Sequence, residues 1–153
     1  MKVLKYKKKR GKLENNWLFK SLESLEKDDW GAVPVGESYL VTSCYRVRKK
    51  PLNSLEIEDI RMLIGQNLGL KYVIPLALKI LQKNILAEGD FYEGDLLKSV
   101  LTSDPDYWKI EREDWNTVIA LYENNLEIIK NEAAEYETGR ALIKAFKDFE
   151  RIK

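Results

Sequence analysis

The stretch IEDIRMLIGQNLGLKYVIPLALKILQKN, residues 57–84, decides the fold class of this 153-residue chain. Its apolar residues recur at intervals of three and four, which places their side chains on one face of an α-helix. These residues are Ile57, Ile60, Leu63, Ile64, Leu68, Val73, Ala77, Ile80 and Leu81. Pro75 cannot donate a backbone hydrogen bond, and its ring crowds the carbonyl of Lys71. The stretch therefore predicts two helices, with a kink or restart between residues 69 and 75.

Gly65 and Gly69 lie between the two predicted helices. They do not form a phosphate-binding loop, because that loop has four residues between its glycines and then Lys followed by Ser or Thr. Here three residues separate the glycines, and Leu70 follows the second. Because glycine has no side chain beyond hydrogen, Gly65 and Gly69 instead predict a helix face against which another helix packs closely. Ser54 and the acids of the next turn predict the start of the first helix, and Asn84 predicts the end of the second.

Helical spacing continues on both sides of this stretch, with Gly and Pro residues between the segments. The other predicted helices are a short one opened by Ser21, one over 38–49 that ends before Pro51, one over 96–101 capped by Asp95, one over 113–136 interrupted at Asn124 and Asn125, and a last one through Phe149 after a break at Gly139. The predicted loops are residues 31–37, 84–94 and 102–110. The 38–49 segment also nearly fits a strand, and we interpret it as helix. The whole pattern predicts an all-α protein, a single compact domain of about six helices.

The composition favours one folded unit and excludes several kinds of chemistry. With 44% hydrophobic and 33% charged residues, the chain can bury a core. It has no histidine and one cysteine, Cys44, which excludes Ser-His-Asp and Cys-His catalysis, histidine-bound metal and an internal disulfide. The longest apolar run, Tyr72 to Leu78, is shorter than the roughly 20 residues of a spanning helix, and no apolar segment of signal-peptide length follows the basic start. We expect a cytoplasmic protein with no membrane span, cofactor or metal.

Charge is distributed unevenly along the chain. Residues 1–12 contain seven Lys and Arg residues and no acid, so the total charge of +1 leaves −6 for residues 13–153. We expect residues 1–12 to be a flexible tail and residues 13–153 to form the helical domain. The acidic domain disfavours nucleic acid and favours basic protein surfaces as partners, whereas the tail taken alone also fits a nucleic-acid or membrane arm.

The segment EGDFYEGD, residues 88–95, combines four carboxylates, two aromatic rings and two glycines. In a structural interpretation, the glycines form turns and Asp95 caps the following helix. A calcium loop of the EF-hand type is disfavoured, because the acids lack the spacing of its ligands. In a protein-binding interpretation, the aromatic rings are anchors and the acids meet a basic partner surface. The candidate contact residues are Glu88, Asp90, Phe91, Tyr92, Glu93 and Asp95.

Other clusters have simpler explanations. The basic run at Arg46, Arg48, Lys49 and Lys50 ends a predicted helix, where the helix dipole favours cations. Carboxylates for hydrolysis are available at Glu58, Asp59, Glu88 and Asp90, but their spacing selects no pair. The four tryptophans are typical of core or interface anchors. We identify no catalytic residue and expect no enzymatic activity.

Residues 21–97, about half of the chain, resemble the immunity proteins of bacterial contact-dependent growth inhibition (CDI) systems. The blocks that carry the resemblance are Ser21-Leu22-Glu23, Leu25-Glu26, Trp30, Ser38-Tyr39-Leu40, Arg48-Lys49-Lys50-Pro51-Leu52, Glu58-Asp59-Ile60-Arg61, Ile64-Gly65-Gln66-Asn67, Gly69-Leu70, Ile74-Pro75-Leu76-Ala77-Leu78, Leu86-Ala87-Glu88-Gly89-Asp90-Phe91-Tyr92 and Gly94-Asp95-Leu96-Leu97. The last two blocks are the most specific. Residues 1–12 and 111–153 take no part in it.

The resemblance implies a cytoplasmic, mainly helical protein that binds one cognate toxin domain and blocks it without catalysis. It does not name the toxin. Many toxins of such systems are nucleases, and an acidic inhibitor suits a cationic substrate channel. The residues alone leave two other functions open. One is a small helical nucleic-acid-associated or regulatory protein that uses residues 2–12 as a basic arm, and the other is a carboxylate-metal hydrolase at residues 88–95.

Overall fold

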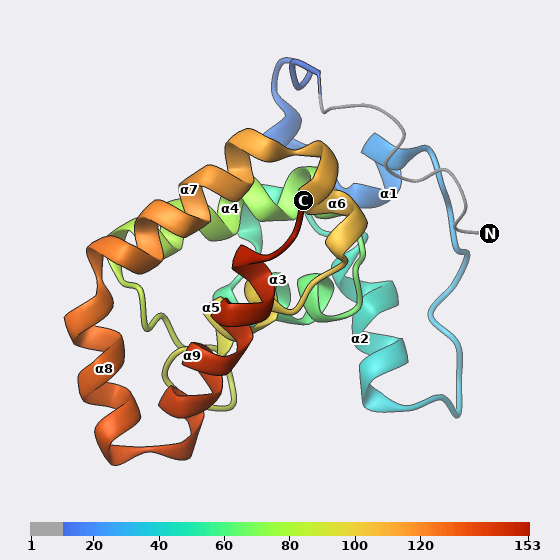
Figure 1. Ribbon diagram of the computed structural model, residues 1–153. Coiled ribbons are helices and arrows are strands. Elements are labelled where there is room, and N and C mark those ends of the chain that lie inside the picture. Colours follow the sequence, from blue (N-terminus) through green and yellow to red (C-terminus); the bar gives the residue numbers. More distant parts are fainter. Residues whose placement is uncertain (1–10) are drawn as a thin grey trace.

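The regular structure of the protein is helical, as the sequence predicts. A computed structural model describes residues 11–153 (Figure 1). Its helices are α1 (Leu22–Glu26), α2 (Tyr39–Val47), α3 (Ile57–Gly65), α4 (Leu70–Lys83), α5 (Asp95–Leu101), α6 (Pro105–Ile110), α7 (Arg112–Asn124), α8 (Leu126–Glu135) and α9 (Glu137–Glu150), with 3-10 turns η1 (Trp17–Phe19) and η2 (Leu52–Ser54). Within the described range, β pairing is limited to two isolated bridges. The all-α class and the single compact helical domain are confirmed.

The stretch at residues 57–84 forms α3 and α4, so the prediction of two helices is confirmed. The chain turns between them with positive φ angles of 56° at Asn67 and 61° at Gly69. The restart therefore precedes Pro75, which lies inside α4. Ser54 is not the N-terminal cap of α3, because it is the last residue of the turn η2. Glu56 caps α3 instead, in a reciprocal capping box with Asp59.

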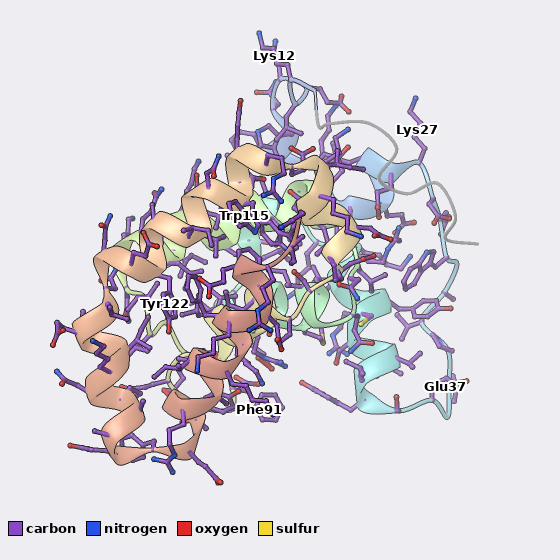
Figure 2. All side chains as sticks on the ribbon, viewed as in Figure 1. Lys12, Lys27, Glu37, Phe91, Trp115 and Tyr122 are labelled. Carbon is purple, nitrogen blue, oxygen red and sulfur yellow. The ribbon has the colours of Figure 1, made fainter. Side chains whose placement is uncertain are left out.

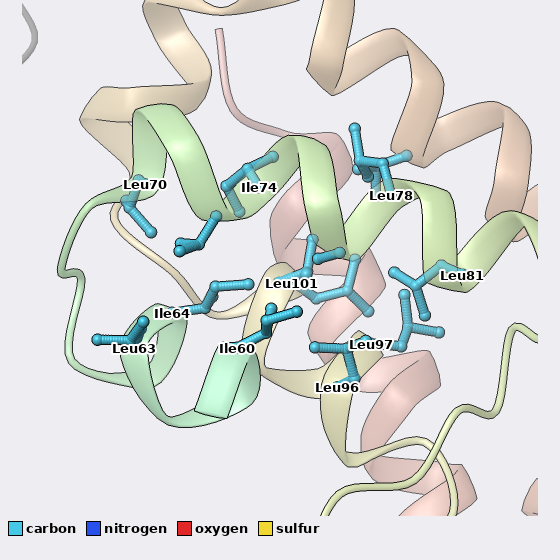
Figure 3. Packing of buried hydrophobic residues seen from close by; sticks show 14 of the residues in the cluster. Ile60, Leu63, Ile64, Leu70, Ile74, Leu78, Leu81, Leu96, Leu97 and Leu101 are labelled. Atoms are coloured by element: carbon cyan, nitrogen blue, oxygen red, sulfur yellow. The ribbon is translucent and has the colours of Figure 1, made fainter. Parts of the chain in front are cut away.

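The core lies where α3, α4 and α5 meet. Figure 3 shows apolar side chains from the three helices gathering between them, among them Ile60, Ile64, Ile74, Leu78, Leu97 and Leu101. Each such burial stabilises the fold by about 1.5–3 kcal/mol before the conformational entropy is subtracted. Figure 1 shows α7 lying along α4, while α8 and α9 form a hairpin whose second helix packs on α5. The core is therefore assembled from segments far apart in the sequence.

Two boundaries differ from the sequence prediction. Residues 102–110 are not all loop, because α6 begins at Pro105 with Asp104 as its cap. Proline is favoured in the first helical turn, since its missing N–H has no helical partner there. Gly139 does not break the chain but lies buried inside α9. The break falls at Tyr136, which is extended, and the predicted interruption after Asn124 is confirmed.

Most of the basic N-terminal run, residues 2–10, lies outside the described residues. The predicted flexible tail, residues 1–12, therefore lies almost entirely outside them. In residues 11–153, no helix combines the length and the apolar character that crossing a membrane requires.

Candidate functional site

The segment between α4 and α5 presents the predicted contact residues at the surface. Phe91 is 69% exposed, and Glu88, Asp90 and Glu93 are exposed with it. Tyr92 is half-buried. The loop thus presents an exposed aromatic ring beside three exposed carboxylates, and aromatic residues are enriched among interface anchors.

Asp95 has a different role from the one the sequence predicts. It is only 3% exposed, and it does not cap α5, whose cap is Gly94. Its carboxylate instead accepts hydrogen bonds from the loop that precedes it. Oδ1 accepts from the N–H of Gly89 at 2.7 Å, and Oδ2 accepts from those of Phe91 at 3.1 Å and Tyr92 at 3.4 Å. One buried carboxylate thus fixes three backbone groups of the loop, and we call this set of hydrogen bonds the first clamp.

A second clamp comes from α3 and was not identified from the sequence. Arg61 donates from Nε to Oε1 of Glu58 and from Nη2 to Oε2 at 2.9 Å. The same Oε1 accepts the N–H of Asp90 at 3.2 Å, and the Arg61 guanidinium carbon lies 4.5 Å from the centre of the Phe91 ring. The spacing of Glu58 and Arg61 on one helix was a visible signal of an ion pair. No feature of the sequence signals that this pair contacts a loop some thirty residues away.

The same contacts shift the ionisation of the pair. Burial alone raises the pKa of Glu58, but the hydrogen bonds from Arg61 and from the Asp90 N–H outweigh it, so the net shift is downward. The hydrogen bond to Glu58 raises the pKa of Arg61. Both groups therefore stay charged at neutral pH, and the cation over Phe91 holds the exposed ring in place.

Glycines make room for this packing at two places in the loop. A Cβ on Gly89 would lie 2.6 Å from Oε1 of Glu58, and one on Gly94 would lie 3.0 Å from Cδ1 of Leu142 in α9. Gly94 also has a φ of 92°, which favours glycine. Helix α3 therefore holds the loop at Gly89, and α9 holds it at Gly94.

The two glycines predicted to allow close helix packing behave differently from each other. Gly69 has a positive φ, and a Cβ there would lie 2.7 Å from Cδ2 of Leu22 in α1, so close packing is confirmed at that position. Gly65 has open space around it, so the prediction is wrong for that residue.

A hollow of about 440 Å³ lies on one side of the loop. Its lining residues are Leu55, Glu56, Ile57, Glu58, Ile80, Glu88, Gly89 and Asp90. Apolar and acidic side chains share this surface, a combination that suits the apolar stem and cationic head of a Lys or Arg side chain.

A smaller hollow of about 290 Å³ lies on the other side of the loop. It is lined by Arg61, Gly65, Phe91, Tyr92, Asp95, Lys98, Ser99 and Thr102. This hollow joins the face of Phe91 to the C-terminal end of α3, where Gly65 leaves open space. The loop thus stands between an acidic and apolar hollow and a second one with cationic and hydroxyl side chains.

Further acids lie beside the loop. Burial raises the pKa of Glu132 in α8, and the negative charges of Glu93 and Glu135 raise it further. The acidic surface therefore continues from Glu93 onto α8. In residues 11–153, no three His, Cys, Asp or Glu side chains form a group that could hold a metal ion.

The second basic run of the sequence is mainly structural. Arg48 is 2% exposed. Its Nη2 lies 3.0 Å from Oε1 of Glu26, its Nη1 donates to the carbonyl of Asp28 at 3.1 Å, and its guanidinium carbon lies 4.1 Å from the centre of the Trp30 ring. Arg48 therefore anchors the segment between α1 and α2 to the body of the protein.

Comparison with protein families supplies the decisive observation. Residues 24–118, more than half of the chain, match the family described as CDI immunity proteins. The chain belongs to this family. Comparison with curated proteins and with solved structures gives no match.

The loop lies inside the range that matches the family. In this CDI immunity protein the matched range runs from α1 into α7 and includes the loop with both of its clamps. Helices α8 and α9 lie outside it, although Leu142 of α9 supports Gly94. The resemblance stated from residues 21–97 is confirmed, and the match extends it to residue 118.

Proposed function

We propose that this protein binds the toxin domain of its own CDI system and neutralises it, without catalysis, through the loop at residues 88–93 and the hollows beside it. The observation that carries the proposal is the double clamp. Asp95 and the Glu58–Arg61 pair hold the loop backbone, while Phe91 and three carboxylates stay exposed. A surface ordered before binding loses less conformational entropy when the partner arrives.

The charge of the loop supports a basic partner. Glu88, Asp90 and Glu93 are exposed on a body of net negative charge, and such a field speeds the approach of a cationic surface. A toxin that cleaves nucleic acid must bind phosphates and therefore carries such a surface. We accordingly propose a nuclease as the toxin, and the cytoplasm as the place of neutralisation.

The energy required is ordinary for a specific complex. A nanomolar dissociation constant corresponds to about −12 kcal/mol, and an interface of about 1,600 Å² reaches it when a few anchors are well buried. Phe91 is the anchor we propose, because its ring is exposed and lies over the Arg61 guanidinium.

Association kinetics test this proposal. We expect the gene immediately upstream to encode a secreted protein that ends in the toxin domain, and this purified domain is the probe. Replacing Glu88, Asp90 and Glu93 with Lys should lower the association rate at least about tenfold at low salt and flatten its salt dependence. The control replaces Glu123, Glu127 and Glu150, which are exposed on α7, α8 and α9, and makes the same change in net charge.

The outcomes are distinct. If the loop variant is slow and the control is not, the loop receives the toxin. Equal effects in both variants would mean that only the overall charge matters, and an unchanged association rate in the loop variant would remove the loop from the mechanism. The nuclease proposal is tested separately, because the purified toxin domain should cleave RNA or DNA and lose that activity at a one-to-one ratio with this protein.

A further inference from the structure

The segment between α1 and α2 concentrates exposed apolar side chains. Eight large apolar side chains are exposed in residues 11–153, and four of them lie within eight consecutive positions: Val33, Val35, Tyr39 and Leu40. Val35 is fully exposed and Tyr39 is 76% exposed. Figure 1 shows the connection from α1 to α2 running along the outer edge of the molecule, where none of the helices of residues 11–153 lies outside it. We call these four side chains the apolar arm.

The arm is held in place at both ends. At its start, Trp30 packs edge-on against Tyr45 of α2 at 5.0 Å between ring centres, and the Arg48 guanidinium carbon lies 4.1 Å from the centre of the Trp30 ring. At its end, the hydroxyl of Ser38 accepts the N–H of Val41 and caps α2. The exposure of the four side chains therefore comes from a defined backbone path.

Acids flank the arm. Asp28 and Asp29 precede it and lie 3.9 Å from Arg48 and Lys49, but their side chains stay 64% and 72% exposed. Glu37 lies within the arm and is exposed. A second copy of this chain would bring acid against acid across a two-fold contact, which is unfavourable. A partner with apolar side chains and a basic rim satisfies both the arm and its acids. The loop at residues 88–93 also favours a basic partner surface.

The helices that carry the two surfaces are neighbours. Figure 2 shows Phe91 and Glu37 both in the lower half of the view. Helix α2 packs on α3, and α3 supplies the Glu58–Arg61 clamp of the loop. The arm and the loop are thus carried by helices that contact each other.

We infer that the apolar arm is a second contact surface for the toxin domain, which covers Val35 and Tyr39 with its own apolar side chains. This inference rests on the proposed function. The two surfaces affect different rate constants. The acids of the loop raise the association rate, whereas the arm lowers the dissociation rate, because buried apolar contacts form only after docking.

Dissociation rates test the inference. The variant V35S/Y39S should raise the dissociation rate of the upstream toxin domain at least about tenfold, while the association rate and its salt dependence stay unchanged. The matched control is I128S/Y136S, which removes two exposed apolar side chains from the α8 region, outside the family match. Both variants should unfold at the urea concentration of the unchanged protein, since none of the four side chains is buried.

Each outcome decides between the two proposals. If V35S/Y39S dissociates like the unchanged protein, the arm does not contact the toxin, while the charge variants of the loop still test the proposed function on their own. A halved molar mass for V35S/Y39S in light scattering would assign the arm to a second copy and overturn the inference. No binding of the unchanged protein to the toxin domain would overturn the proposed function and the inference together.

Discussion

Asp95 shows how one buried residue determines the shape of an exposed loop. It lies at the start of α5 with its carboxylate directed back at the loop, where it accepts three backbone N–H groups. Burying an ionised carboxylate is costly unless hydrogen bonds replace its water, and these bonds do so. The loop and the carboxylate therefore depend on each other.

Replacing Asp95 with Asn should destabilise the protein. The amide keeps the shape but loses the charge, and its NH2 group cannot accept, so at least one of the three hydrogen bonds is lost. Hydrogen bonds to a charged group are worth about 1.5–3 kcal/mol. We expect the free energy of unfolding in urea to fall by about 2 kcal/mol and toxin binding to weaken with it. Asp148→Asn on the exposed side of α9 is the control, with a change below about 0.5 kcal/mol. An equally stable D95N would show that the clamp contributes nothing.

Glu58 makes the stability of the loop depend on pH. Its pKa is below the ordinary value of 4.5 in the folded protein, so its contribution is complete above that pH and is lost as the pH falls through the folded pKa. The stability difference between the unchanged protein and E58Q should therefore be constant from pH 7 to 5 and shrink below 4.5.

Urea unfolding of both proteins at several pH values measures this difference. Glu123→Gln on the exposed face of α7 is the control, and its difference from the unchanged protein should stay flat across the same range. A difference for E58Q that is also flat would contradict the assigned ion pair with Arg61.

At the scale of elements, two helical glycines differ in what surrounds them. Gly139 lies inside α9, and a Cβ there would lie 2.5 Å from the backbone nitrogen of Ala133 in α8. Gly65 ends α3 and has no neighbour within reach of a Cβ. The first glycine sets the distance between two helices, and the second lines an open hollow.

Replacing Gly65 or Gly139 with alanine should change the stability of the protein in opposite directions. Gly65→Ala should stabilise the protein by about 0.4–1 kcal/mol, because alanine restricts the unfolded chain and meets nothing in the fold. Gly139→Ala gains the same helix propensity, but it must separate α8 from α9, so we expect a net loss of about 1–3 kcal/mol. Thermal or urea unfolding measures both. Equal shifts of the same sign would contradict the close contact at Gly139.

At the scale of the whole molecule, the described residues share one core that reaches from α1 to α9. Trp108 of α6 is fully buried and meets Phe149 of α9 edge-on, with 5.0 Å between ring centres. Tyr122 of α7 stacks on Phe146 of α9 at 3.6 Å. The helices beyond the family match thus complete the core of the part that matches.

A chain that ends at Asn125 should therefore not fold. It loses Ile129, Leu142, Phe146 and Phe149, each worth about 1.5–3 kcal/mol by burial, against a total stability of about 5–15 kcal/mol for a protein of this kind. Near-ultraviolet circular dichroism should lose the signal of packed aromatic rings, and the full chain should unfold in one cooperative transition. A cooperative transition in the shortened chain would show that α8 and α9 are a separate unit.

The sequence alone determined the helical class, the two helices of residues 57–84 and the exposed aromatic and acidic residues of the loop, because periodicity and composition are local properties of a chain. It missed α6, although Asp104 and Pro105 signal its start, and it placed the last break at Gly139. Whether a glycine breaks a helix or admits a neighbour depends on what packs against it. The roles of Asp95, Glu58 and Arg61 were decided by the tertiary structure, because their hydrogen bonds or ring contacts join α3, α5 and the loop, and only folding brings these together.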